Sequence, residues 1–276
     1  MLMKASVHAG LVLAALLAQH SLAAPKSELW PYWQSDNAGS DVTVDHQIWQ
    51  KLLSRFVVSG NDKINRVAYQ DFDDAAKTQL RRYLNTLSKI APTRLNRKEQ
   101  LAYWINLYNA QTVQVVLDHP MKKSILSMGP FLSLGPWDEP YLNIEGKPVT
   151  LNDIEHRILR PIWQDHRLHY VLNCASLGCP NLNREAYSAA TIERQLAQAE
   201  REFLQHPRAI SLTQRGKLQL TSLFDWYLKD FANSKNQLLT YLARQRPDLA
   251  PAIKGFADAK SPAIDYVYDW DLNVID

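Results

Sequence analysis

Apolar residues recur at helical spacing in one segment after another, and this pattern limits the chain to a mostly helical fold. Ile48, Leu52 and Phe56 begin the first such segment, which starts near Asp45. A second helix is expected over 72–90, and a long third helix is expected over 97–117. Between these segments, Gly, Pro and Asn clusters interrupt the periodicity and predict short connections.

The remaining segments mix short strands with further helices. The pair Thr150 and Asp153 forms a capping box that opens a helix, and Pro161 is expected to close it. The sequence therefore predicts an α+β fold, a mostly helical single domain with a small, mainly antiparallel sheet. Helices are expected over 151–160, 192–204, 224–231 and 237–244, strands over 66–69, 168–173 and 264–268, and hairpins within 121–150 and 209–220.

The first residues have the features of an export signal. Lys4 provides the positive start, the apolar stretch 11–18 is too short to span a bilayer, and Ser21-Leu22-Ala23 fits a cleavage site. We expect a signal peptide over 1–23, cleaved after Ala23, and a secreted or periplasmic protein; the alternative is an uncleaved membrane anchor. A loosely ordered lead-in over 24–44 and a single domain over 45–276 follow, with no membrane span in the mature chain.

Composition excludes several classes of protein. Lys plus Arg total 31 against 28 Asp plus Glu, so the net charge of +3 gives no reason to expect a nucleic-acid partner. The 2 cysteines are too few for a four-cysteine zinc cluster or a disulfide-dense scaffold. We expect no cofactor, no metal, and an unidentified small molecule or peptide as the partner.

Polar residues share a face of the expected long helix. Asn106 and Asn109 lie three residues apart, with Tyr103 one turn earlier. Asparagine is a poor residue for a helix interior, and buried amides need hydrogen-bond partners. The two amides could fix the packing of neighbouring loops, or they could position a ligand or a catalytic histidine.

The segment 151–160 contributes charged candidates. His156 lies about 100° around the helix from Glu155, so one side chain should not hold the other, whereas Arg160 shares the face of His156. A lone histidine on a helix often has a purely structural role. Arg160 lies near the C-terminal end of the helix, where its positive charge interacts favourably with the helix dipole even without a function.

Cys174 follows the strand expected over 168–173 and opens a loop that returns to Cys179. In a strand, His169 would lie about 16 Å from Cys174 and on the opposite face, which makes His156 the better partner. The cysteines could form a structural disulfide, or Cys174 could be a nucleophilic thiolate. A reversible redox pair is favoured least, because the spacing is wider than C-x-x-C.

Several strings together resemble the DUF547 family, a domain of unknown function, as a bacterial secreted member. The resemblance runs from about Val67 to Asn273, and plant relatives match at the Glu-His pair and at the first cysteine but have serine in place of Cys179. That match implies a role for Cys174 beyond the disulfide. The matching strings are 101–110, 154–160, 172–180, 224–231 and 268–273.

The leading hypothesis is a Cys-His hydrolase or acyltransferase that acts on an amide or thioester. Cys174 would be the nucleophile, His156 the general base, and Asn106 or Asn109 the group that holds the imidazole. Backbone N–H groups of 175–178 would stabilise an oxyanion. Binding roles are assigned to Glu155, Arg160, Ser176 and Tyr103.

The alternative is a non-catalytic binding or assembly module in which Cys174 and Cys179 form a structural disulfide. Trp30, Trp33 and Trp270 would then present an apolar surface to a partner. A metal site built from His156, His166 and His169 is a weaker option, because these residues lack the HExxH spacing.

Overall fold

The computed structural model describes residues 25–131, 133–258 and 264–275, so the expected signal peptide lies outside the described residues. The fold is α+β and mostly helical, as predicted. The α-helices are α1 (Gln47–Phe56), α2 (Asp74–Leu87), α3 (Arg97–Asp118), α4 (Arg160–Trp163), α5 (Ile192–Gln205), α6 (Leu223–Trp226), α7 (Leu228–Phe231), α8 (Lys235–Gln245) and α9 (Ala250–Asp258). A π-helix, η5 (Asp153–Leu159), precedes α4, and the 3-10 helices are η1 (Pro31–Gln34), η2 (Tyr69–Asp71), η3 (Pro92–Arg94), η4 (Ile125–Ser127) and η6 (His166–Tyr170).

Within the described residues, the strands form three small sheets that are mainly antiparallel, as predicted. Two of the sheets are antiparallel pairs, and in the third β6 pairs antiparallel with β5 and parallel with β7. The strands are β1 (Val57–Ser59), β2 (Asn65–Val67), β3 (Leu142–Ile144), β4 (Lys147–Val149), β5 (Ile210–Leu212), β6 (Leu218–Thr221) and β7 (Ile264–Val267).

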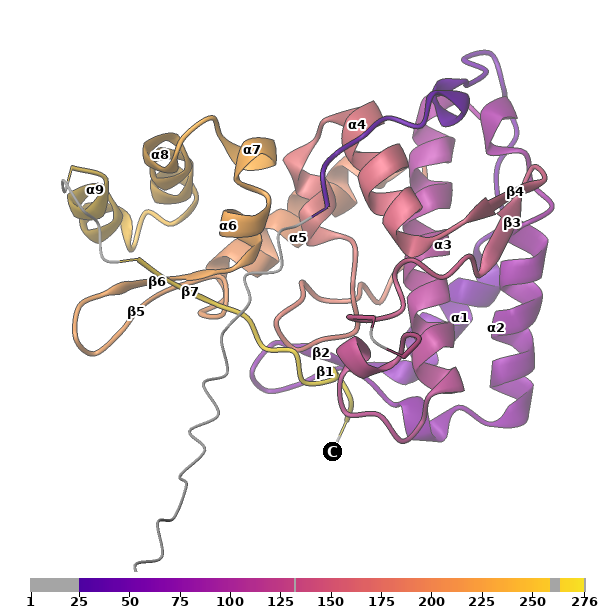
Figure 1. Ribbon diagram of the computed structural model, residues 1–276, viewed down its shortest axis with the longest axis horizontal. Helices are drawn as coiled ribbons and strands as arrows, with labels where there is room; N and C mark the ends of the chain where they lie inside the picture. Colours follow the sequence, from indigo (N-terminus) through magenta and orange to yellow (C-terminus); the bar gives the residue numbers. More distant parts are fainter. Residues whose placement is uncertain (1–24, 132, 259–263, 276) are drawn as a thin grey trace, which may run out of the picture.

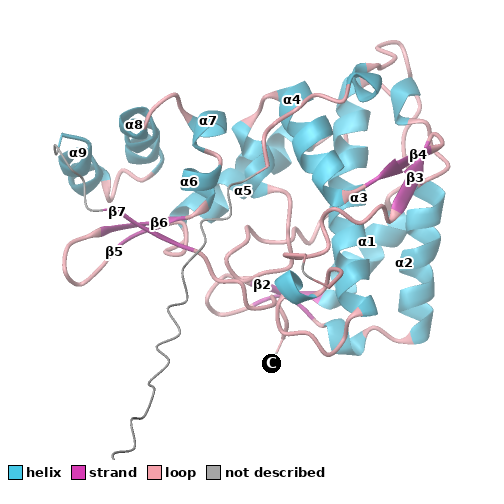
Figure 2. Cartoon of the chain, viewed as in Figure 1, coloured by secondary structure: helices cyan, strands magenta, loops and turns pink. Residues whose placement is uncertain are grey.

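Helix α3 is the central element of the larger hydrophobic core. Its residues from Glu99 to Val116 are all buried, including polar ones such as Asn106 and Asn109, because other elements cover the helix all round. A smaller core forms between β5, β6, α8 and α9. Figure 1 shows α1, α2 and α3 at one end of the molecule and β5, β6, β7, α8 and α9 at the other. Loops make up much of the region between the two ends (Figure 2).

The segment after the expected signal peptide is held against the domain. Trp33 is fully buried, and its ring packs edge-on against Trp104 of α3. Backbone N–H groups of Glu28 and Trp30 donate to the carbonyls of His156 and Arg157 at 3.0 and 2.9 Å. This segment, expected to be loosely ordered, therefore lies along η5 (Figure 1).

Two local expectations are wrong. The strand expected over 168–173 is the 3-10 helix η6 and a turn, because six alternating residues do not fix a strand without a neighbouring strand to pair with. Pro161 does not close its helix, since it lies in the first turn of α4, where a missing N–H is tolerated. The helix ends at Gln164, which adopts the left-handed conformation.

The loop that carries both cysteines packs against the C-terminal segment. Leu177 and Gly178 donate backbone hydrogen bonds to the carbonyls of Asp271 and Asp269, both at 2.8 Å. A Cβ placed on Gly178 would lie 2.7 Å from the backbone nitrogen of Asp269, so only glycine fits. The close approach holds the cysteine loop beside the segment that contains Tyr268.

Replacing Gly178 with alanine should therefore lower the free energy of unfolding by about 1–3 kcal/mol, because the loop and the C-terminal segment must move apart. The measurement is urea unfolding at neutral pH. Gly255→Ala is the matched control, since a Cβ there meets nothing within 4 Å and alanine favours the helix. Equal stability of Gly178→Ala and the wild-type protein would contradict this close packing.

Candidate functional site

A cavity of about 240 Å³ lies where α3, η5, η6, the cysteine loop and the C-terminal segment meet. Apolar and aromatic side chains form most of its wall, with a few polar groups among them, which is the usual composition of a ligand site. The lining residues are Pro25, Tyr108, Leu134, Trp137, Asp138, Asn152, Glu155, His156, His169, Leu172, Cys174, Cys179, Pro180, Leu223, Trp226, Tyr227, Tyr268 and Trp270.

The π-helix η5 delivers Glu155 and His156 to this cavity. The predicted capping box starts the helical segment, since Asp153 N–H donates to Thr150 Oγ1 at 2.9 Å and Thr150 N–H donates to Asp153 Oδ2 at 3.0 Å. Hydrogen bonds in a π-helix reach one residue further than in an α-helix, and such turns are frequent at functional sites. Glu155 and His156 both border the cavity, whereas helical geometry predicts that neighbouring side chains point in different directions.

A carboxylate, an imidazole and a guanidinium form an ion-paired group behind the cavity. Asp230 Oδ2 accepts from Arg160 Nε at 2.6 Å and from His169 Nε2 at 2.7 Å. Burial alone would raise the pKa of Asp230, but the hydrogen bonds from His169 and Arg160 outweigh it and hold that pKa below its ordinary value. Asp230 is therefore an anion, and it fixes a proton on Nε2 of His169.

The two imidazoles differ in their hydrogen bonds. Arg160 Nη1 lies 2.9 Å from Nδ1 of His156, and because a guanidinium can only donate, this nitrogen must accept. Burial lowers the pKa of His156 to about 4, so its ring is neutral at pH 7 and carries its proton on Nε2. His169 has the opposite arrangement, with Nε2 bound to Asp230 and Nδ1 turned towards Glu155.

Glu155 lies between these two rings. Its Oε1 is 4.0 Å from Nδ1 of His156 and 3.9 Å from Nδ1 of His169, while Oε2 accepts from the Tyr108 hydroxyl at 3.0 Å. Tyr227 stacks on His169 with ring centroids 4.2 Å apart, which limits rotation of that imidazole. The cavity thus holds a carboxylate and two oriented imidazoles that can accept or donate protons.

The lowered pKa of His156 makes stability depend on pH. In the unfolded chain His156 has its ordinary pKa of 6.5 and binds a proton below that pH, whereas in the folded protein the buried imidazole stays neutral down to about pH 4. The free energy of unfolding therefore falls as the pH falls from 6.5 towards 4. The expected slope from this group is about 1 kcal/mol per pH unit. Urea unfolding from pH 7 to 4 should show a shallower decline for His156→Gln, and an unchanged slope would contradict the assignment.

Cys174 and Cys179 are joined in a disulfide at the wall of the cavity, with their Cα atoms 6.1 Å apart. Cys174 is partly exposed, whereas Cys179 is buried. Tyr268 OH donates to Cys179 Sγ at 3.2 Å and lies 3.1 Å from Cys174 Sγ, and Ser176 Oγ donates to Tyr268 OH at 3.2 Å. The structure therefore contains the Cys174–Cys179 disulfide that was one of the open alternatives.

The two asparagines of α3 bind backbone groups. Asn106 Nδ2 donates to the Tyr187 carbonyl at 2.8 Å, and Asn106 Oδ1 accepts from the Tyr187 N–H at 3.0 Å. Asn109 likewise bridges Val171 and Asn173, at 2.9 and 2.8 Å. Within the described part of the chain, neither amide is hydrogen-bonded to His156, so the asparagines hold the loops that carry other site residues.

Other proposed roles are also changed by the structure. Tyr103 is fully buried and donates to the Leu87 carbonyl at 3.1 Å, away from the cavity lining. Three of the four N–H groups expected to form an oxyanion hole are already used: Ala175 donates to Asn173 Oδ1, and Leu177 and Gly178 bind the C-terminal segment. Arg160 does not line the cavity itself, but it donates hydrogen bonds to His156, which lines it, and to Asp230.

His169 was set aside on strand parity, and that argument fails because the segment is the 3-10 helix η6. His169 borders the same cavity as Cys174. Asp230, Tyr227 and Tyr268 were not predicted as site residues, since they are distant in sequence. The strings 224–231 and 268–273, which resemble the family, contain all three and were the signal that could have found them.

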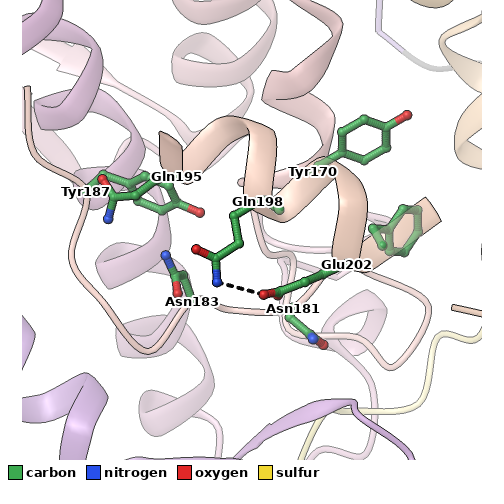
Figure 3. A pocket seen from close by; sticks show the side chains of 9 residues that line it. Tyr170, Asn181, Asn183, Tyr187, Gln195, Gln198 and Glu202 are labelled. Atoms are coloured by element: carbon green, nitrogen blue, oxygen red, sulfur yellow. Dashed lines mark hydrogen bonds between the residues drawn. The ribbon is translucent and has the colours of Figure 1, made fainter. Parts of the chain in front are cut away.

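A second hollow lies between α5 and the loop before it, and it is too small for a ligand. Its volume is about 10 Å³, which has room for a single water. Figure 3 shows Asn181 and Asn183 facing this hollow and Gln198 bound to Glu202. That hydrogen bond measures 2.8 Å and joins successive turns of α5.

His166 pairs with Glu200 at 2.9 Å instead of lining the cavity of about 240 Å³ with His156 and His169. No group of three or more His, Cys, Asp or Glu suited to a metal occurs over 25–131, 133–258 and 264–275. In the same ranges, no helix combines the length and apolarity needed to cross a bilayer.

Comparison with known proteins finds a similarity to one family in the part of the chain that holds most of the cavity. The model of the family described as "Protein of unknown function, DUF547" matches residues 92–204, which include Glu155, His156, His169 and both cysteines. The curated proteins and the solved structures gave no match. The resemblance seen in the sequence is thereby confirmed over residues 92–204, the range that the DUF547 family model matches.

Proposed function

We propose that this protein is an exported cysteine-dependent hydrolase or acyltransferase that acts on an amide or thioester when Cys174 is reduced. The observation that supports the proposal is the cavity itself, whose lining includes Cys174, Glu155, His156 and His169. A thiol becomes a strong nucleophile when an adjacent imidazole takes its proton.

His169 is the better general base. Asp230 holds its Nε2 proton, which leaves Nδ1 free to accept another and stabilises the imidazolium that would form. His156 is a weak base at neutral pH, because burial lowers its pKa to about 4 and Arg160 occupies its Nδ1. His156 is better suited to donate through Nε2. Asp230 takes the orienting role that the sequence had suggested for Asn106 or Asn109.

In this proposal the disulfide is the resting form of the site. A sulfur bonded to Cys179 cannot attack a carbonyl, so the oxidised protein should be inactive and the reduced protein active. In the reduced form the thiolate would add to the acyl carbon, and the amine or thiol would leave with a proton from the imidazolium. Water or a second nucleophile would then release the acyl group from Cys174.

Formation of an acyl-enzyme tests the proposal without knowledge of the natural substrate. Reduced protein is incubated with p-nitrophenyl acetate or an acyl thioester, and intact-mass spectrometry should detect one acyl group on Cys174. Oxidised protein and reduced Cys174→Ser should remain unmodified, and His169→Gln should react more slowly than His156→Gln. Equal acylation of all these forms would contradict the proposal.

The disulfide favours a second candidate, a non-catalytic binding module. Trp137, Trp226, Tyr268 and Trp270 form a continuous cluster of rings at the cavity, with neighbouring centroids 4.6 to 6.1 Å apart. The faces of these aromatic rings can bind a ligand while the disulfide stays intact. A ligand that raises the melting temperature of the oxidised protein and of Cys174→Ser equally would support this candidate.

A further inference from the structure

The two sulfurs of the disulfide have unequal surroundings, and this difference suggests a reaction of the oxidised protein. Cys174 is partly exposed and borders the cavity, so an entering molecule reaches its sulfur first. Cys179 has only 4% of its surface exposed. Thiol–disulfide exchange depends on which sulfur is attacked and on how well the other sulfur leaves as a thiolate.

Hydrogen bonds favour Cys179 as the leaving sulfur. Its Sγ accepts from the Cys174 backbone N–H at 2.9 Å and from Tyr268 OH at 3.2 Å. Burial raises the pKa of the Tyr268 phenol well above its ordinary value, so this donor keeps its proton at neutral pH. Tyr268 OH also lies 3.1 Å from Cys174 Sγ, and Ser176 Oγ lies 3.2 Å from that sulfur, so the Cys174 backbone N–H is the donor that distinguishes Cys179 from Cys174. Donors of this kind stabilise a thiolate and improve it as a leaving group.

We propose that the cavity is a site of thiol–disulfide exchange in which a low-molecular-weight thiol attacks Cys174 and Cys179 leaves. His169, oriented by Asp230, accepts the proton of the entering thiol. The thiolate forms a bond to Cys174 Sγ, the Cys174–Cys179 bond breaks, and its electron pair departs with Cys179. A second thiol then attacks the small-molecule sulfur of the mixed disulfide and releases Cys174 as a thiolate. The two thiols are oxidised to one disulfide, and the protein disulfide is reduced to two thiols.

This activity concerns the same cavity as the proposed acyl transfer, for which it would supply the reduced Cys174. It does not require that acyl transfer take place. A small thiol is favoured over a protein substrate because the sulfur is reached from a cavity of about 240 Å³.

The test uses oxidised full-length protein and the tripeptide thiol glutathione at neutral pH. Samples are quenched with an alkylating reagent, and mass spectrometry follows the loss of the protein disulfide. Tyr268→Phe should exchange about tenfold more slowly, because it removes one donor to the leaving sulfur. Tyr266→Phe, on the adjoining strand β7, should exchange at the wild-type rate. Melting curves verify that both variants fold.

A second variant tests whether Cys174 can hold the mixed disulfide. Cys179→Ser has no resolving thiol, so oxidised glutathione should convert it to a stable adduct on Cys174. A wild-type disulfide that reacts only after unfolding, or a Tyr268→Phe variant as fast as Tyr266→Phe, would overturn the proposal. Exchange is measured without an acyl substrate, and acylation is measured on protein reduced beforehand by a phosphine, so either activity can fail without the other.

Discussion

Replacing Asp230 with asparagine is expected to slow acylation of the reduced protein by about 10²–10⁴-fold. Asp230 binds His169 at 2.7 Å and Arg160 at 2.6 Å, so its charge fixes the imidazole tautomer and stabilises the imidazolium. An amide has no charge, and it can present its NH₂ group to the ring and leave the proton on the wrong nitrogen. The rate of acyl-adduct formation, followed by intact mass at pH 7, measures the effect.

Asp225→Asn is the matched control, because Asp225 is exposed on α6 and lies outside the cavity lining. Its acylation rate should equal that of the wild-type protein. Circular dichroism and melting curves establish whether Asp230→Asn is folded, and Asp230→Glu should recover part of the rate by restoring the charge. A folded Asp230→Asn protein that reacts at the wild-type rate would remove His169 and Asp230 from the proposed mechanism.

Replacing Arg160 with methionine is expected to lower the free energy of unfolding by about 3–5 kcal/mol. The Arg160 side chain is only 7% exposed, and its removal leaves the partly buried Asp230 carboxylate without the guanidinium that pairs with it. It also removes the donor to His156 and a bond from Nη1 to the Pro25 carbonyl at 2.8 Å. Methionine preserves much of the aliphatic part of the Arg160 side chain, so the decrease in the free energy of unfolding comes mainly from the lost polar contacts.

Arg157→Met provides the comparison from the same helical segment. Arg157 pairs with Asp153 at 2.8 Å, but its side chain is 43% exposed, and exposed pairs of this type contribute about 1 kcal/mol or less. Urea unfolding at pH 7 measures both variants. A loss for Arg160→Met no larger than that for Arg157→Met would show that the buried ion pair does not stabilise the fold.

Much of the fold could be predicted from local sequence patterns. The helix predicted over 97–117 is α3 (Arg97–Asp118). Both signals for it, the spacing of its apolar residues and the break at His119-Pro120, lie within or directly after the segment itself. The hairpin predicted around Arg215-Gly216 is present, with Gly216 in the left-handed conformation that its turn requires. Such elements depend on residues that are close together in the sequence, so the sequence is sufficient to predict them.

The site was harder to predict because it depends on contacts between distant residues. His169 and Asp230 are 61 positions apart, and no local pattern connects them. Glu155 and His156 are neighbours on the π-helix η5 and both line the cavity, although helical geometry predicts that their side chains diverge. His169 was assigned to a strand on a short alternation, and the tertiary structure made it a 3-10 helix. The cysteine pair was recognised, but its place in an aromatic cavity was not.

The most direct test of the central claim is the pH dependence of Cys174 alkylation in the reduced, folded protein. Iodoacetamide reacts with the thiolate, so the rate against pH reports the pKa of the thiol. If His169 is its base, the wild-type protein and His156→Gln should react well below the ordinary thiol pKa of about 8.5. In His169→Gln this reactivity at low pH should be lost. Three identical profiles with an ordinary thiol pKa would contradict the proposed Cys174–His169 site.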